Sequence, residues 1–212
     1  MLQKAAVDKN LMDLLLRLQS DPVLNNFILA GGTALALTLG HRKSVVIDLF
    51  SDTDFDEGKL LEHLERNYDF RMNFMSRSTL RGSVGDVRVD LIAHNYPYLK
   101  KPLVMNGIRL LSYEDIAAMK VNAIAGDGTR VKDFIDIYFL LNEFSFGEII
   151  GFFSAKYSSR NNAHAIKSLA WFEDADVNDW PVMIKESNLT FKEVEKKITI
   201  HRKRFLAGEG IS

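Results

Sequence analysis

Hydrophobic residues follow two different periods in the first half of the chain. Leu11, Leu14, Leu15 and Leu18 fall on one face of a helix, which predicts an amphipathic helix near the N-terminus. Short apolar or β-branched runs instead predict strands, and these cover residues 26–30, 44–50, 79–84, 87–93 and 107–111. The two periods together predict a sheet with helices packed on it.

Turn and capping residues place the connections between these elements. Gly85-Asp86 separates two strand-like runs and is typical of a hairpin, so the stretch 68–94 is predicted to be antiparallel. Asp56 precedes a helical pattern over residues 57–66 as an N-cap, and a short helix is predicted over 33–39.

After Ser112 the pattern becomes helical. The helices predicted there cover residues 113–125, 131–143, 146–157, 163–171 and 191–205. We therefore expect an α+β fold in which residues 1–112 form a mixed sheet with flanking helices and residues 113–212 form a helical region packed on it.

Composition excludes several classes of protein. The chain has 212 residues, 47% of them hydrophobic and 26% charged, which suits a globular protein with a sizeable core. It has no cysteine, so neither a disulfide framework nor a thiolate zinc site is expected. The longest apolar stretch is too short to cross a bilayer and no signal peptide is recognised, so we expect a cytoplasmic protein without a membrane partner. The net charge of −1 gives no overall attraction to nucleic acid, and any RNA contact would need a local patch.

Gly31, Gly32 and Thr33 lie where a predicted strand turns into a helix. Glycines allow a ligand to approach the backbone closely, and free N–H groups at a helix N-terminus suit a phosphate. Thr33 adds a hydroxyl donor. A Gly-Gly pair is also common in turns that bind nothing, so this motif alone does not decide the function.

Two aspartates interrupt predicted strands of β-branched residues. Asp48 shares a strand face with Val46 and Phe50, and Asp90 shares one with Arg88 and Ile92. A carboxylate in such a strand is costly to bury unless it is paired or bound to a cation. Asp48 and Asp90 are therefore predicted to hold Mg²⁺ or Mn²⁺, the ions that prefer oxygen ligands. The alternative is an aspartate that only bonds a neighbouring loop.

A lysine and two aspartates form a third cluster in the helical half. Lys120 lies on an apolar helix stripe, and Asp133 and Asp136 on the next predicted helix offer partners, with Lys132 four residues before Asp136. One interpretation is a structural ion pair between helices. The other is that Lys120 holds a triphosphate while Asp133 or Asp136 orients it.

Taken in order, these motifs resemble the DNA polymerase β-like nucleotidyltransferase superfamily and, more closely, the AbiEii/AbiGii family of abortive-infection toxins. The matching segments are LAGGTALAL at 29–37, LGHRKS at 39–44, IDLFS at 47–51, IAAMK at 116–120 and KDFIDIYFLL at 132–141. The resemblance covers residues 27–142, while the remaining residues match only as a helical tail.

The resemblance implies a metal-dependent transfer of a nucleoside monophosphate from a nucleoside triphosphate to an acceptor. Two magnesium ions about 3.5–4 Å apart usually clamp the reacting oxygens in such sites. It implies catalytic roles for Asp48, Asp90, Lys120 and Asp133, and nucleotide contacts from Gly31, Gly32, Thr33, Arg42, Ser44, Lys120 and Asp136. Some relatives act on transfer RNA, and some are toxins with a cognate antitoxin.

The chain departs from the family pattern at one position. The family places a carboxylate two residues before Asp48, and this chain has Val46 there. Valine cannot bind a metal, which leaves three hypotheses open: a weakened enzyme, a degenerate module that still binds a nucleotide or a partner, and a purely structural protein.

The end of the chain offers a possible RNA contact. Six basic residues make the last predicted helix positive: Lys192, Lys196, Lys197, Arg202, Lys203 and Arg204. They could hold an RNA backbone, although basic residues at a helix C-terminus are also expected from the helix dipole alone. Trp171, Phe172 and Trp180 are expected to pack the helical half together.

Overall fold

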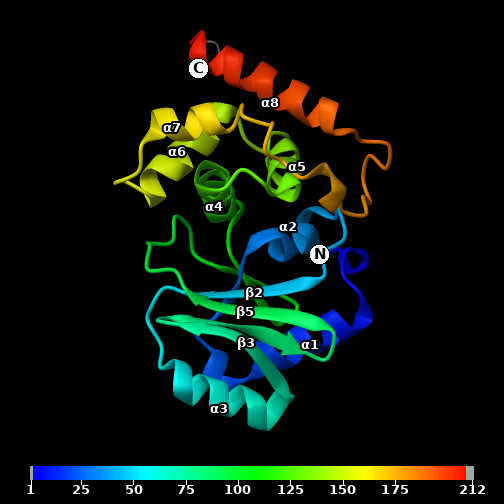
Figure 1. Ribbon diagram of the computed structural model, residues 1–212, viewed down its shortest axis with the longest axis vertical. Helices are drawn as coiled ribbons and strands as arrows, with labels where there is room; N and C mark the ends of the chain where they lie inside the picture. Colours follow the sequence, from blue (N-terminus) through cyan, green and yellow to red (C-terminus); the bar gives the residue numbers. More distant parts are fainter. Residues whose placement is uncertain (1, 209–212) are drawn as a thin grey trace. The chain divides into compact units, whose positions relative to one another are not determined.

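The computed structural model describes residues 2–208 and divides into two compact units, Met1–Leu111 and Ser112–Ser212 (Figure 1). The division falls one residue before the predicted boundary. Ser112 caps the first helix of the second unit, since its side chain accepts a hydrogen bond from the Asp115 amide. Within the described residues no helix is long and apolar enough to cross a membrane.

The first unit is a seven-stranded mixed sheet with three α-helices, which confirms the predicted α+β class. The strands, in the sheet order β3-β4-β5-β2-β1-β7-β6, are β1 (Ile28–Leu29), β2 (Val46–Ser51), β3 (Phe70–Ser76), β4 (Thr79–Val84), β5 (Val87–Ala93), β6 (Leu103–Met105) and β7 (Ile108–Leu110). The helices are α1 (Lys9–Ser20), α2 (Gly31–Leu39) and α3 (Glu57–Tyr68). β2 runs parallel to β5, and β3, β4 and β5 form an antiparallel meander.

Alternation of side chains gives this sheet one apolar face. Ile47, Leu49, Leu80, Val89 and Leu91 are all fully buried. Helices α1 and α3 pack against the sheet and bring their own buried leucines to the core (Figure 1). The opposite face carries Asp48 of β2, Arg81 and Ser83 of β4, and Arg88 and Asp90 of β5, so the alternation places the apolar core and the charged residues on different faces.

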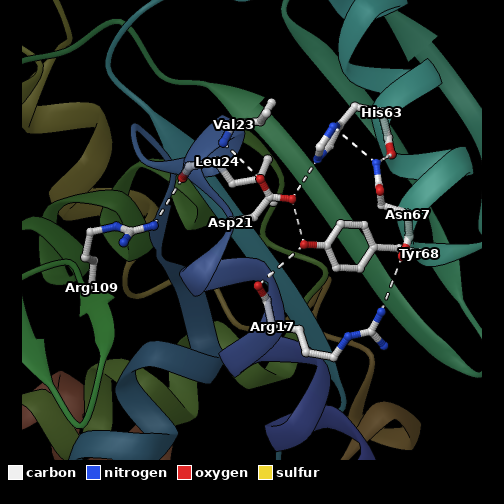
Figure 2. A network of polar contacts seen from close by, with 8 residues as sticks. All are labelled: Arg17, Asp21, Val23, Leu24, His63, Asn67, Tyr68 and Arg109. Carbon is white, nitrogen blue, oxygen red and sulfur yellow. Dashed lines mark hydrogen bonds and ion pairs between the residues drawn. The ribbon is translucent and has the colours of Figure 1, made fainter.

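A polar network joins α1 to α3 at the far side of this unit (Figure 2). The Asp21 carboxylate accepts hydrogen bonds from the Tyr68 hydroxyl (2.7 Å) and from the Val23 amide (2.9 Å), and its Oδ2 lies 2.6 Å from Nε2 of His63. Arg17 stacks its guanidinium over the Tyr68 ring. Asp21 thus links the end of α1 to α3 through one partly buried carboxylate.

The second unit contains five α-helices within the described residues. They are α4 (Tyr113–Gly126), α5 (Val131–Leu140), α6 (Phe146–Lys156), α7 (Asn162–Ser168) and α8 (Phe191–Leu206). Helix α4 packs on α5, α6 and α7, and α8 packs on α5 and α6. Ser145 and Thr190 each form a capping box at the start of α6 and α8, which explains why both helices begin where the sequence predicts.

The structure corrects several element predictions. The sequence predicted no separate strand for the residues of β3 or β6. These two strands lie at the edges of the sheet, where an alternating apolar face is not needed. Helix α5 ends at Leu140 instead of residue 143, and α2 begins at Gly31 instead of residue 33. Trp171 is 46% exposed and does not pack as expected, whereas Phe172 and Trp180 both contact Phe191.

Candidate functional site

The turn between β1 and α2 is built around Gly31. This residue has φ +63°, a conformation that L side chains rarely adopt. A Cβ atom there would lie 2.7 Å from Oδ2 of Asp48, so any other side chain would push this carboxylate aside. Glycine thus suits both the backbone conformation and the close approach, and the first turn of α2 lies directly against the Asp48 carboxylate.

Thr33 and Ser44 fix this turn to β2. The Thr33 hydroxyl donates to the Val46 carbonyl (2.5 Å) and lies 2.7 Å from the Ser44 hydroxyl, and both side chains are buried. Arg42 is also buried and donates to the Lys43 carbonyl. These bonds give Thr33 a structural role that the sequence did not predict, and the expected phosphate contacts of Thr33, Arg42 and Ser44 stay predictions.

The two strand aspartates are brought together by the parallel pairing of β2 and β5. Asp48 is in register with Asp90, so both carboxylates point to the same face of the sheet on strands about 4.8 Å apart. Asp48 is half-buried and Asp90 is only 5% exposed. Two carboxylates this close repel each other unless a cation lies beside them.

Arginine supplies that positive charge in this structure. Arg88 donates from Nε to Oδ1 of Asp90 (3.1 Å) and from Nη2 to Oδ2 (2.7 Å). Arg81, on the other side of Asp90, has its Nε 3.8 Å from Oδ2. The hydrogen bonds to Asp90 raise the pKa of Arg88 against the opposing effect of burial, and the charges of Asp90 and Asp48 act in the same direction.

Val46 is the neighbour of Arg88 in the sheet. The two residues are in register, on the face that carries the carboxylates. The position where the family places a second carboxylate is therefore apolar and lies beside a guanidinium. No group of three or more metal-binding side chains is found within residues 2–208. Asp48 is the carboxylate that a divalent cation would contact here, since Arg88 donates to both oxygens of Asp90, and the metal site stays a prediction.

The helical unit contains the other predicted cluster. Lys120 on α4 has its Nζ 2.5 Å from Oδ1 of Asp133 and 2.7 Å from Oδ2 of Asp136, both on α5. All three side chains are buried. The structural ion pair between helices is thus present, and the contact of Lys120 with a triphosphate stays a prediction. Lys132, expected near Asp136, instead bonds Asp179.

Sequence reasoning missed Arg81 as a neighbour of the site. A signal for it exists, because a two-residue turn at Gly85-Asp86 pairs Val84 with Val87 and then necessarily Arg81 with Asp90. Counting back from the turn would have placed Arg81 beside the carboxylate.

Comparisons with known proteins agree with this geometry. The family model of the AbiEii nucleotidyl transferase toxin of type IV toxin–antitoxin systems matches residues 13–100 and 68–206. An uncharacterized protein of Aquifex aeolicus is 33% identical over 159 residues, which cover 72% of this chain and 77% of that protein.

Two solved structures share the fold. The nucleotidyltransferase toxin MenT4 of Mycobacterium tuberculosis superposes with a TM-score of 0.61 at 15% identity, over 92% of this chain and 80% of that one. JHP933 of Helicobacter pylori superposes with a TM-score of 0.56 at 16% identity, over 96% and 94% of the two chains.

Proposed function

The chain belongs to the AbiEii family of nucleotidyl transferase toxins, and we propose that it transfers a nucleoside monophosphate from a nucleoside triphosphate to an acceptor. One observation carries the proposal. Asp48 lies in register with Asp90 and directly against the Gly31 turn, so acidic groups and a phosphate-binding helix N-terminus share one spot.

The residues of this spot have separate roles. The free N–H groups at the start of α2 bind phosphate oxygens of the triphosphate beside Asp48. The acceptor hydroxyl oxygen forms a bond to the α-phosphorus while the bond to the leaving diphosphate breaks. Asp90 takes the hydroxyl proton, and Arg88 and Arg81, which lie beside it, offset negative charge on the phosphates.

We propose Mg²⁺ or Mn²⁺ as the cofactor, held by Asp48. When bound, such an ion neutralises phosphate charge and orients the phosphates for an in-line transfer. Glycine at position 31 supports this proposal, because a Cβ there would lie 2.7 Å from Oδ2 of Asp48 and would crowd an ion held by that carboxylate.

A second function is favoured by Val46. Since the carboxylate expected there is missing and Arg88 holds Asp90, the scaffold could bind a nucleotide with little or no turnover. Calorimetry with each nucleoside triphosphate separates the two functions, because binding without transfer supports the module and not the enzyme.

The direct test is a label-transfer assay with each labelled nucleoside triphosphate, Mg²⁺ or Mn²⁺ and total transfer RNA. We expect transfer by the natural chain, loss with Asp48→Asn and a gain with Val46→Asp. Val45→Asp is the matched control, because Val45 is 66% exposed and precedes Val46 outside the strand. If neither the natural chain nor Val46→Asp transfers label to any RNA, the proposed enzyme is wrong.

The acceptor and the partner are further proposals. Transfer RNA is the acceptor class we propose, and the family's toxin–antitoxin context supports a cognate antitoxin. Co-expression with the gene neighbours of this chain, scored for rescue of growth, tests the antitoxin.

A further inference from the structure

The face of the sheet that carries the carboxylates continues beyond them to the edge. Asp48 is in register with Asp90, Asp90 with Arg81, and Arg81 with Phe74. Residues paired in register point to the same side of a sheet. These four side chains therefore form one row that crosses β2, β5, β4 and β3.

A second row runs beside the first. Val46 is in register with Arg88, Arg88 with Ser83, and Ser83 with Arg71. The register of β3 shifts by one residue between Met72 and Phe74, so Arg71 and Phe74 share a face although they are three residues apart. The two rows place three arginines and one phenylalanine on the same face as the carboxylate pair. We name Arg71, Phe74, Arg81, Ser83 and Arg88 the arginine–phenylalanine face.

This face is open over its outer half. Phe74 is 48% exposed, and the side chains of Arg81 and Arg88 are 43% and 56% exposed. Arg71 is also exposed, and β3 is the last strand of the sheet. The exposed Phe74 ring and the exposed arginine side chains therefore form one accessible surface, on which an aromatic ring and cationic groups are neighbours.

Charge and geometry on this face point to one class of ligand. The acidic residues in the two rows are Asp48 and Asp90, and from Arg81 to the edge every charged residue is cationic. The Arg81 guanidinium lies over the Phe74 ring, 5.5 Å from its centre, and the Arg81 side chain is 43% exposed. Guanidinium groups bind phosphates, and an exposed ring with a guanidinium beside it stacks on an unpaired base.

We propose that the arginine–phenylalanine face binds the single-stranded end of a nucleic-acid acceptor. One unpaired base stacks on Phe74 while Arg71 and Arg81 bind backbone phosphates, and the terminal hydroxyl reaches the carboxylates. The row spans three gaps between strands, about 14 Å from Phe74 to Asp48, which is the reach of a few nucleotides. The proposal rests on the proposed function, because it assigns an acceptor to that site.

A double-stranded acceptor fits this face less well, because stacked bases offer no free surface to Phe74. The basic helix α8 is the competing surface. The groove between α8 and Trp171 is lined by Lys192, Lys196 and Lys203, but Glu173 and Glu195 line it too. Its charges largely cancel, whereas the outer half of the arginine–phenylalanine face has none of opposite sign.

The test measures binding without catalysis. A fluorescein-labelled single-stranded RNA of about ten nucleotides is titrated in EDTA without any nucleoside triphosphate, and anisotropy gives the affinity. Loss of one stacked base predicts a weakening of about 5- to 150-fold for Phe74→Ala, and Phe74→Tyr should keep the affinity. Arg71→Gln and Arg81→Gln should each lower the salt slope of log K by about 0.7.

Two matched controls sharpen the result. Trp171→Ala removes an aromatic ring of similar exposure, and Arg66→Gln removes an exposed arginine on α3, paired only with Glu62 in the structure's salt bridges. Both should bind as the natural chain does. Unchanged binding by Phe74→Ala and Arg71→Gln, or a larger loss with Trp171→Ala, would overturn the proposal.

Failure of this proposal can be told from failure of the proposed function. If the natural chain transfers label while Phe74→Ala changes neither RNA affinity nor KM for the acceptor, the proposed binding face is wrong and the proposed transfer activity is kept. If RNA binding depends on Phe74 but no transfer occurs, the binding face is kept and the proposed activity is wrong. Thermal unfolding of each variant confirms that it is folded.

Discussion

The two acidic clusters of this protein use the same kinds of residue for opposite purposes. In the helical unit, Lys120 is enclosed with Asp133 and Asp136, and every one of these side chains is buried. In the sheet unit, Asp48 is half-buried and the arginines beside Asp90 are exposed. All three side chains of the first cluster are enclosed, whereas the second combines the buried Asp90 with an arginine that reaches the surface. Exposure of the charged partners, and not residue type, distinguishes the candidate site from the structural ion pair.

The largest expected effect tests the structural side of this comparison. Lys120→Met leaves two buried carboxylates without their cation and should lower the free energy of unfolding by about 3–5 kcal/mol. Urea unfolding measures it. Lys132→Met is the control, because its partner Asp179 is exposed and the expected loss is about 1 kcal/mol or less. A loss below about 1 kcal/mol for Lys120→Met would show that the cluster is not structural.

Asp21 is an intermediate case, with a carboxylate that is held tightly but lies near the surface (Figure 2). Burial alone would raise its pKa, but hydrogen bonds from His63, Tyr68 and the Val23 amide lower it overall. The charged Asp21 carboxylate therefore stabilises the folded protein fully at pH values above the ordinary pKa of an aspartate, about 3.9. This stabilisation is lost as the pH falls through the lower pKa of the folded state.

Asp21→Asn should therefore destabilise the protein at neutral pH by about 1.5–3 kcal/mol, because hydrogen bonds to a charged group are lost. The difference from the natural chain should shrink as the pH falls below about 4. Unfolding free energies measured between neutral pH and a pH of about 2.5 check both parts. A difference that stays constant with pH would exclude the charge of Asp21 as the cause.

A substitution at Gly31 tests the close contact between this residue and the Asp48 carboxylate. Gly31→Ala introduces a Cβ that displaces the Asp48 carboxylate, and we expect transfer activity to fall about tenfold or more. Gly85→Ala is a close control, because Gly85 also has a positive φ but no atom lies within 4 Å of the position that its Cβ would take. Both variants should lose about 1 kcal/mol of stability from backbone strain. Equal activity of the two variants would remove Gly31 from the site.

Val46 gives the smallest expected effect. In Val46→Asp the new carboxylate lies next to Arg88 in the sheet and should compete for its guanidinium, which frees Asp90. We expect the affinity for Mn²⁺, measured by electron paramagnetic resonance of the free ion, to rise about tenfold, or about 1.4 kcal/mol. Val45→Asp should leave it unchanged. No gain for Val46→Asp would mean that Arg88 keeps this site from binding a metal.

Local patterns in the sequence predicted the elements of the fold well. The spacing of leucines predicted α1, the Asp56 cap predicted the start of α3, and Gly85-Asp86 predicted the β4–β5 hairpin. The edge strands β3 and β6 were not predicted, because an edge strand lacks a partner on one side and shows little alternation. For that reason the exposed Phe74 drew no attention in the sequence.

The sequence by itself determined which residues are candidates for the site, because glycine, aspartate and lysine each interrupt an apolar pattern that would otherwise be uniform. Gly31, Asp48, Asp90 and Lys120 all follow from that contrast. Only the tertiary structure decided which of them are neighbours. The parallel pairing of β2 with β5 joins residues distant in the chain, and it sets Asp48 beside Asp90 and Val46 beside Arg88. Such pairing depends on how two distant strands dock in a shared core, which no local periodicity encodes.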